Sequence, residues 1–140
     1  MTRYLLDTNI ISELRKIKPH GAVLQWIGEL VDEQILLSAV TLGEFQLGIE
    51  RTRMQDPEKA REIEEWADQL AQSYRVLPMD AACFREWGKL KRDKPGRILE
   101  DGMIAATARV HDLTVATRNT RDFARFEVPL FNPFTHPSKD

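Results

Sequence analysis

The chain has 140 residues, 42 % of them hydrophobic and 30 % charged, and we expect residues 1–140 to form a single globular domain. No run of about 18 apolar residues occurs, which argues against a transmembrane helix, and a single cysteine excludes an internal disulfide. The 20 basic and 22 acidic residues give a net charge of −2, so overall charge does not by itself indicate a nucleic-acid partner.

Short apolar runs alternate with amphipathic stretches along the chain. The first run, YLLD at residues 4–7, predicts a buried strand, followed by a helix from Thr8 to about Arg15 with Thr8 or Asn9 as its cap. Helices are expected over 21–31, 41–53 and 56–74, with strands over 35–39 and 75–78. A helix beginning at Asp80, a break at Pro95-Gly96 and a helix over 98–112 precede strands over 113–117 and 128–131.

This alternation predicts an α/β fold in which a central parallel sheet is covered by helices on both faces. The crossovers between its strands should be right-handed. Ligands of open α/β sheets bind at the carboxyl ends of the strands. Polar residues that directly follow a strand, or lie in the first turns of the next helix, are therefore the candidates for a functional site.

Four acidic residues occupy such positions. They are Asp7, Glu44, Asp101 and Asp122. Four carboxylates on one rim would repel each other unless a cation lay between them, and carboxylate oxygens suit Mg²⁺ or Mn²⁺ better than zinc. Such a metal polarises a phosphodiester, activates water and stabilises the leaving oxygen. Taken alone, Asp7 could equally be a helix cap.

Other chemistries find little support in the sequence. The three histidines, His20, His111 and His136, are widely scattered, and Cys83 alone cannot build a thiolate zinc site. There is no nucleophile elbow for Ser–His–Asp catalysis and no glycine-rich phosphate loop.

Positive charge is concentrated in the second part of the chain. Residues 1–84 hold 9 basic and 14 acidic residues, whereas residues 85–140 hold 11 and 8. The stretch REWGKLKRDKPGR at 85–97 contributes six basic residues, Arg85, Lys89, Lys91, Arg92, Lys94 and Arg97. This stretch is either a solvated helix face or a surface that binds the phosphate backbone of a nucleic acid.

Four motifs, in this order, resemble those of the PIN-domain ribonucleases, and most closely the VapC-type toxins of bacterial toxin–antitoxin pairs. They are LLDTNIISE (5–13), TLGEFQLGI (41–49), EDGMIAATA (100–108) and ATRNTRDF (116–123). Together they extend over nearly the whole chain. One departure is Gly102, where such sequences commonly have alanine; a glycine there weakens the first turn of its helix by roughly 0.5–1 kcal/mol.

The resemblance implies a three-layer α/β/α PIN-like fold and a Mg²⁺- or Mn²⁺-dependent endoribonuclease. It implies Asp7 and Asp101 as metal ligands, with Glu44 and Asp122 completing the acidic set, and Thr8, Asn9 and Asn119 as polar support. It also implies a homodimer, and an antitoxin that inserts a segment into the active site. The basic residues 85–97 would then contact RNA.

Two alternatives remain open from the sequence. The same metal site could cleave DNA or a structured nucleic acid, since the chemistry at phosphorus is shared. A non-catalytic regulatory α/β module, with Asp7 as a phosphoacceptor or metal-binding residue, is the alternative from another class. The first strand begins too early for a signal peptide and the single cysteine fits a reducing compartment, so we expect a cytoplasmic protein.

Overall fold

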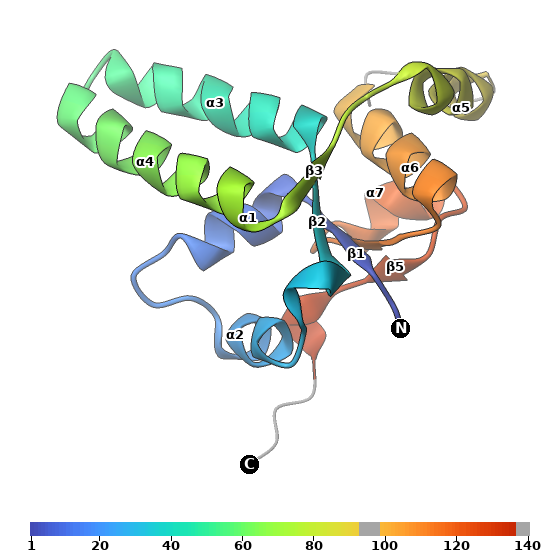
Figure 1. The fold of residues 1–140 in the computed structure, drawn as a ribbon, viewed down its shortest axis with the longest axis horizontal. Coiled ribbons are helices and arrows are strands. Elements are labelled where there is room, and N and C mark those ends of the chain that lie inside the picture. Colours follow the sequence, from blue (N-terminus) through green and yellow to red (C-terminus); the bar gives the residue numbers. More distant parts are fainter. Residues whose placement is uncertain (93–98, 137–140) are drawn as a thin grey trace.

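A five-stranded parallel sheet forms the middle of the computed structural model, which describes residues 1–92 and 99–136 (Figure 1). The strands are β1 (Tyr4–Leu6), β2 (Ile35–Ser38), β3 (Arg75–Leu77), β4 (Thr114–Ala116) and β5 (Leu130–Phe131). Their order is β3-β2-β1-β4-β5, so the chain builds outward from β1 on one side and then crosses to the other. The direction of strand addition therefore reverses between β1 and β4, where open α/β sheets bind ligands.

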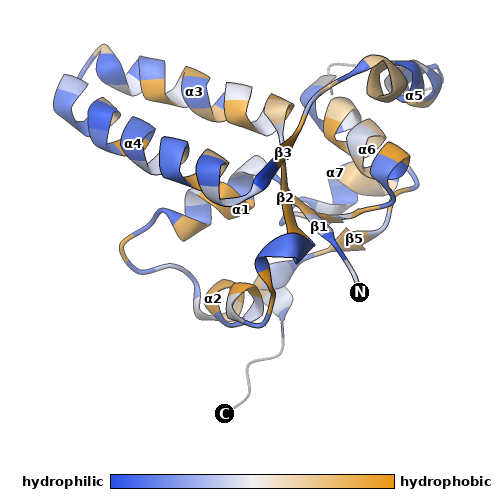
Figure 2. Cartoon of the chain, viewed as in Figure 1, coloured by the Kyte–Doolittle hydropathy of each residue, from blue (hydrophilic) through white to orange (hydrophobic). Residues whose placement is uncertain are grey.

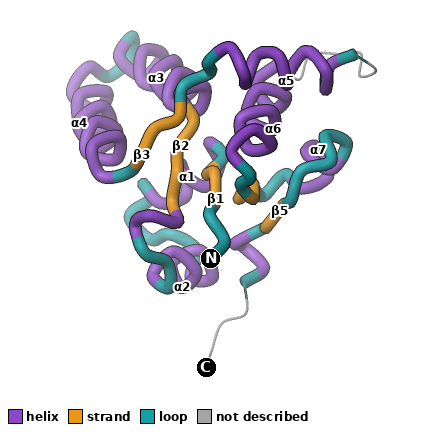
Figure 3. Tube along the Cα trace, turned by 45° about the vertical axis from the view of Figure 1, so that its right-hand side comes forward, coloured by secondary structure: helices purple, strands orange, loops and turns teal. Residues whose placement is uncertain are grey.

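Helices connect the strands and cover both faces of the sheet. The described ones are α1 (Thr8–Leu14), α2 (Gly21–Gly28), α3 (Ala39–Arg53), α4 (Pro57–Ser73), α5 (Ala81–Lys91), α6 (Leu99–His111) and α7 (Thr120–Ala124), with 3₁₀ turns at Asp32–Gln34 and Pro133–Thr135. Figure 3 shows the strands lying between the α3–α4 pair and the group formed by α5, α6 and α7. None of these helices is long and apolar enough to cross a membrane.

Each face of the sheet has its own apolar core, because side chains alternate along a strand. Leu5, Leu36 and Val115 pack on one face with residues of α5, α6 and α7. Leu6 and Leu37 point to the opposite face and pack with residues of α1, α2 and α4. Burial on both faces explains why the strands read as continuous apolar runs. The expected three-layer α/β/α fold is confirmed.

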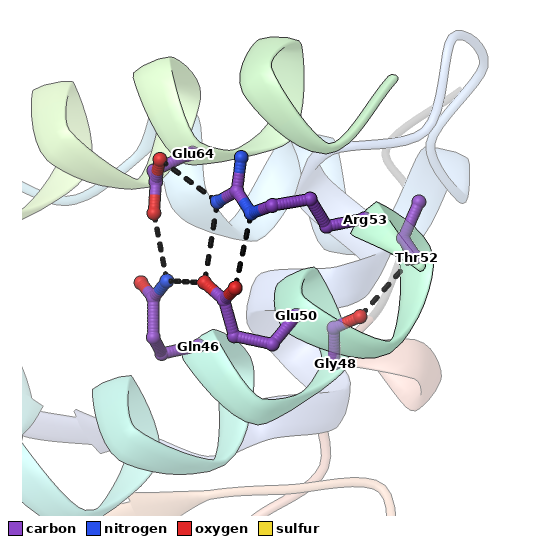
Figure 4. Close-up of polar contacts among 6 residues, drawn as sticks. All are labelled: Gln46, Gly48, Glu50, Thr52, Arg53 and Glu64. Carbon is purple, nitrogen blue, oxygen red and sulfur yellow. Dashed lines mark hydrogen bonds and ion pairs between the residues drawn. The ribbon is translucent and has the colours of Figure 1, made fainter. Parts of the chain in front are cut away.

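The helices α3 and α4 lie side by side and project from the sheet as a hairpin (Figure 1). Arg53 donates from Nε to Glu50 at 3.0 Å and forms an ion pair with Glu64 on α4 at 3.0 Å (Figure 4). Gln46 donates to both of these glutamates at 2.7 Å. The network faces solvent, where salt screens it, and α4 is mostly hydrophilic (Figure 2). Its role is to fix the pairing of the two helices rather than to supply much stability.

Most expected elements are present, and the differences have local causes. The helix expected over 41–53 begins at Ala39, because the Ser38 hydroxyl at the end of β2 accepts a hydrogen bond from the Val40 amide at 3.0 Å. The cap of α1 is Asp7, so the expectation that Thr8 or Asn9 caps it is wrong. Periodicity does not predict α7, which is too short to show one. The expected break at Pro95-Gly96 lies outside the described residues.

Replacing Leu37 by alanine should lower the free energy of unfolding by about 2–5 kcal/mol, because this fully buried side chain would leave a cavity beside the central strand. Urea denaturation followed by circular dichroism measures the loss. Met54→Ala is the matched control: this side chain is 87 % exposed after α3, and its loss should change stability by less than about 0.5 kcal/mol. Equal stabilities for the two variants would contradict the packing described.

Candidate active site

A cavity of about 460 Å³ lies at the carboxyl ends of β1 and β4, where the strand order reverses. Asp7 follows β1 directly, while Arg118 and Asn119 lie just beyond β4. Glu44 reaches the cavity from the second turn of α3, and Asp101 from the first turn of α6. The remaining lining residues are Thr8, Asn9, Ser12, Glu13, Lys16 and Phe134. Three of the four acidic residues singled out in the sequence thus share one cavity.

Asp7 caps a helix and lines the cavity at the same time. One carboxylate oxygen, Oδ1, accepts from the Thr8 amide at 2.8 Å. The other, Oδ2, accepts from Asn9 Nδ2 at 3.1 Å and from the Thr117 hydroxyl at 2.8 Å. The residue is 5 % exposed, and this burial raises the pKa of its carboxyl, while the three hydrogen bonds, led by that from Thr117, oppose the rise.

Glu44 is far from Asp7 in the sequence but lines the same cavity. Its Oε1 accepts a hydrogen bond from the Thr8 hydroxyl at 3.0 Å, so the residue after Asp7 links the two acids. Burial raises the pKa of Glu44, and the negative charges of Asp7 and Glu100 raise it further, against the hydrogen bond from Thr8. Glu100 therefore contributes its charge to the site from the first turn of α6.

Asp101 has the most strongly shifted carboxyl of the site. Burial, followed by the charges of Asp7, Asp122 and Glu44, raises its pKa to about 6, and the Arg125 guanidinium opposes this rise. Within residues 1–92 and 99–136 its carboxylate receives no hydrogen bond. Among these residues, no hydrogen-bond donor occupies either oxygen of Asp101, whose place at the start of α6 sets it near the other acids.

Asp122 occupies a different position from the other three acids. It lies on α7, is exposed, and does not line the cavity. Its charge nevertheless raises the pKa of Asp101, which places it near the edge of the site. The sequence expectation that all four acids act as metal ligands stays a prediction, and for Asp122 the geometry supports an electrostatic role more directly than a lining one.

The polar residues expected to support the site form a network that includes one the sequence analysis did not identify. Asn9 donates to Asp7 and accepts from the Arg118 amide at 3.2 Å. The Thr117 hydroxyl donates to Asp7 and accepts from the Asn119 amide at 2.9 Å. Thr117 thereby ties β4 to Asp7. The signals for it in the sequence are its position at the end of an apolar run and its place in the motif ATRNTRDF.

Glu13 organises the rim of the cavity, although the sequence analysis gave it no role. It is 6 % exposed and accepts from Lys16 Nζ and from the His20 amide, both at 2.9 Å. These hydrogen bonds lower the pKa of its carboxyl. They also hold the segment after α1 against the cavity and leave Lys16 on its rim. The available signal was that Glu13 ends the same motif that contains Asp7.

The basic residues of the stretch 85–97 that the structure describes do not line this cavity. Its described members are Arg85, Lys89, Lys91 and Arg92. Lys89 and Arg92 line a separate hollow of about 440 Å³ together with Arg109 and Arg125. Arg125 links the two places, because its charge also acts on Asp101. Lys94 and Arg97 lie outside the described residues.

The chemistry of the site fits a hard divalent cation. The cavity is lined by the carboxylates of Asp7, Glu13, Glu44 and Asp101, and its lining among the described residues contains no Cys or His, the ligands that zinc prefers. Mg²⁺ is less demanding, because it keeps several waters and is usually held by one or two carboxylates. The raised pKa values of Glu44 and Asp101, caused in part by neighbouring negative charges, are those of a site that a cation would stabilise.

Comparison with known proteins identifies relatives over nearly the whole chain. The model of the PIN domain family matches residues 4–129. The toxin FitB of Neisseria gonorrhoeae is 36 % identical over 137 residues, which cover 93 % of this chain and 97 % of FitB. The VapC ribonuclease Y4jK of Sinorhizobium fredii is 36 % identical over 141 residues, covering 93 % of this chain and 96 % of Y4jK.

Solved structures agree with the sequence matches. The crystal structure of FitAcB from Neisseria gonorrhoeae has a TM-score of 0.83 at 34 % identity and covers 94 % of this chain and 99 % of that one. A toxin–antitoxin complex from Klebsiella pneumoniae shares the fold, with a TM-score of 0.71 at 23 % identity over 93 % of this chain and 97 % of that one. The strand-end acids, the sheet order and these relatives all lead to one conclusion: the chain belongs to the PIN domain family.

Proposed function

We propose that this protein is a divalent-metal-dependent endoribonuclease, the toxin of a type II toxin–antitoxin pair. The observation that carries the proposal is the meeting of Asp7, Glu44 and Asp101, from three distant parts of the chain, in one cavity at the strand-order reversal. The relative Y4jK is named a VapC ribonuclease and FitB a toxin, which supports the choice of RNA as substrate and of the toxin role.

In this proposal Asp7, Glu44 and Asp101 hold Mg²⁺ or Mn²⁺, with Asp122 contributing charge from the edge. The ion would supply Lewis-acid activation of the phosphodiester and of the attacking water. The residues of the chain supply orientation: Thr8, Asn9 and Thr117 fix both oxygens of Asp7, and Thr8 also fixes Glu44. The three hydrogen bonds to Asp7 use two acceptor positions on Oδ2 and one on Oδ1, which leaves a lone pair of Oδ1 for a metal ion.

The proposal includes two protein partners, an antitoxin and a second copy of this chain. An acidic cavity is a good receptor for an arginine, whose guanidinium forks onto carboxylates, so we propose that a cognate antitoxin inhibits by inserting a segment here. Homodimerisation is proposed from the family resemblance; the exposed Leu47 on α3 and Phe84 on α5 are apolar side chains available to such a contact. A cytoplasmic site of action is part of the proposal and agrees with Cys83 being free.

Cleavage of labelled single-stranded RNA by the antitoxin-free protein should require Mg²⁺ or Mn²⁺ and stop in EDTA. Asp7→Asn and Asp101→Asn should each reduce the rate by at least about 100-fold, because a metal ligand is lost. Asp68→Asn on the exposed side of α4 is the matched control and should retain full activity. Equal cleavage of DNA of the same sequence would favour the alternative of a general nuclease, and cleavage in EDTA would contradict the metal requirement.

Asp101→Asn should stabilise the metal-free protein, by on the order of 1 kcal/mol after allowance for solvent screening, because it removes charge repulsion without breaking a hydrogen bond. The folded-state pKa of about 6 lies above the ordinary value of 3.8. The folded protein therefore binds this proton more tightly than the unfolded chain, and the repulsion penalty is present near pH 7 and disappears as pH falls towards about 4.

Thermal melts in EDTA between pH 4 and 7 measure this effect as the difference between wild type and variant. The gap should close as pH falls, and also as Mg²⁺ or Mn²⁺ stabilises wild type by mass action. Asp68→Asn again serves as control and should melt like wild type throughout. A lower melting temperature for Asp101→Asn at pH 7, with no response of wild type to metal, would mean that the cavity does not store repulsion for a cation.

The double variant Lys89→Ala/Arg92→Ala should weaken binding of RNA and reduce the slope of log K against log salt by about 1–2, if both side chains contact phosphates. Arg125 lines the same hollow and its charge acts on Asp101, so in this proposal a strand bound in the hollow continues towards the cavity. Lys59→Ala/Arg61→Ala, an exposed basic pair on α4, is the control. A salt slope equal to that of wild type would identify residues 85–92 as an ordinary solvated face.

A further inference from the structure

One wall of the acidic cavity is built from a cation and an aromatic ring. Arg118 lies just beyond β4, and its Cζ is 4.4 Å from the centroid of the Phe134 ring. Both residues line the cavity that contains Asp7, Glu44 and Asp101. A cationic guanidinium and a phenyl ring do not ligate a metal ion, so these two residues must contribute something else to the site.

The guanidinium of Arg118 lies over an aromatic ring instead of pairing with a carboxylate of the described residues. Among the described residues its side chain makes no hydrogen bond and no ion pair, and it contacts the face of the Phe134 ring. The residue is exposed, while its backbone is fixed by the hydrogen bond from its amide to Asn9 Oδ1. An arginine has five N–H donors in a planar group, and here all five are available to a ligand that enters the cavity.

Phe134 is held rigidly beneath the arginine. It lies in the 3₁₀ turn Pro133–Thr135, where its amide donates to Asn132 Oδ1 at 3.0 Å. The ring of His20 meets it edge to face, with centroids 5.1 Å apart. His20 is in turn fixed at both ends, because its amide donates to Glu13 and its Nδ1 accepts from the Ala22 amide at 3.2 Å. The ring is therefore supported from its backbone and from its edge by contacts within the chain.

We propose that Arg118 and Phe134 form a platform for one nucleobase of a single-stranded substrate, next to the place where the phosphodiester is cleaved. Single-stranded RNA is commonly read by stacking of unpaired bases on aromatic rings and on guanidinium planes. One side of the Arg118 guanidinium covers Phe134, and the group is otherwise open to a base or to a flanking phosphate. Lys16, on the same cavity, supplies a second cation for the backbone.

This platform deepens the proposed nuclease function and rests on it. The carboxylates account for cutting a phosphodiester but are indifferent to which base lies beside it. A stacking site next to the carboxylates would favour binding of single-stranded RNA over a duplex. A base in a duplex must first be unpaired and unstacked before it can stack on the platform, and this costs free energy. In this proposal, Arg118 and Phe134 select for unpaired RNA.

The test is the binding of fluorescently labelled short RNA to the full chain in EDTA, by anisotropy, with an abasic nucleotide moved along the strand. For wild type, one abasic position should weaken binding by about 5- to 100-fold. Arg118→Lys keeps the charge but not the plane, so it should retain the salt slope and reduce the abasic penalty to less than about 2-fold. Phe134→Leu should do the same, and Arg118→Ala should in addition lower the salt slope by roughly 0.7.

Arg61→Lys on α4 is the matched control and should keep the full abasic penalty, and thermal melts establish that each variant is folded. A full penalty in Arg118→Lys and Phe134→Leu, or no penalty at any position in wild type, would overturn the platform. Cleavage with Mn²⁺ is measured separately. If the protein cleaves RNA but no abasic position weakens binding, the platform is rejected and the nuclease function stands. If an abasic position weakens binding but the protein does not cleave RNA, the nuclease function is rejected and the base-binding site stands.

Discussion

The buried carboxylate of Asp7 is the constraint around which the site is arranged. A charge that is 5 % exposed is costly unless donors surround it, and Asp7 receives three hydrogen bonds, from Thr8, Asn9 and Thr117. Those bonds orient both oxygens but do not cancel the charge, whose influence extends to Glu44 and Asp101. The fold thus keeps an unfavourable concentration of negative charge at one point. Such a concentration is tolerated because the two apolar cores on either side of the sheet supply the stability.

The strand order brings the acidic residues together at one edge of the sheet. Only at the reversal between β1 and β4 can residues from the first strand, the start of α3 and the start of α6 meet. Cationic groups surround the acids without neutralising them: Lys16 is tied to Glu13, Arg118 lies over Phe134, and Arg125 acts on Asp101 from the neighbouring hollow. A negative centre with a positive rim is suited to a metal ion and a polyanion together, since each is attracted to a different part of the surface.

The sequence carries enough local information to predict the strands, the fold class and the positions of the strand-end acids. Asp7, Glu44 and Asp101 could be found because each stands at a recognisable junction between an apolar run and a helix. Thr117, Arg118 and Phe134 could not, since their roles depend on contacts with residues far away in the chain. Gly102 shows the same limit. It is expected only to weaken its helix, but a Cβ there would lie 3.3 Å from the Trp87 indole, so the glycine also permits the close approach of α5 to α6.

The hydrogen bond between Thr117 and Asp7 joins residues 110 positions apart, and β1 pairs with β4 over the same interval. A ribosome adding 5–20 residues per second needs roughly 5–20 s to travel from one partner to the other. During that time the first strand has emerged without its neighbour on one side, and Asp7 has no Thr117 to hold it. A nascent chain therefore cannot complete this centre until most of the protein has been translated. For the proposed nuclease, the order of synthesis therefore makes the complete centre one of the last parts of the fold to form.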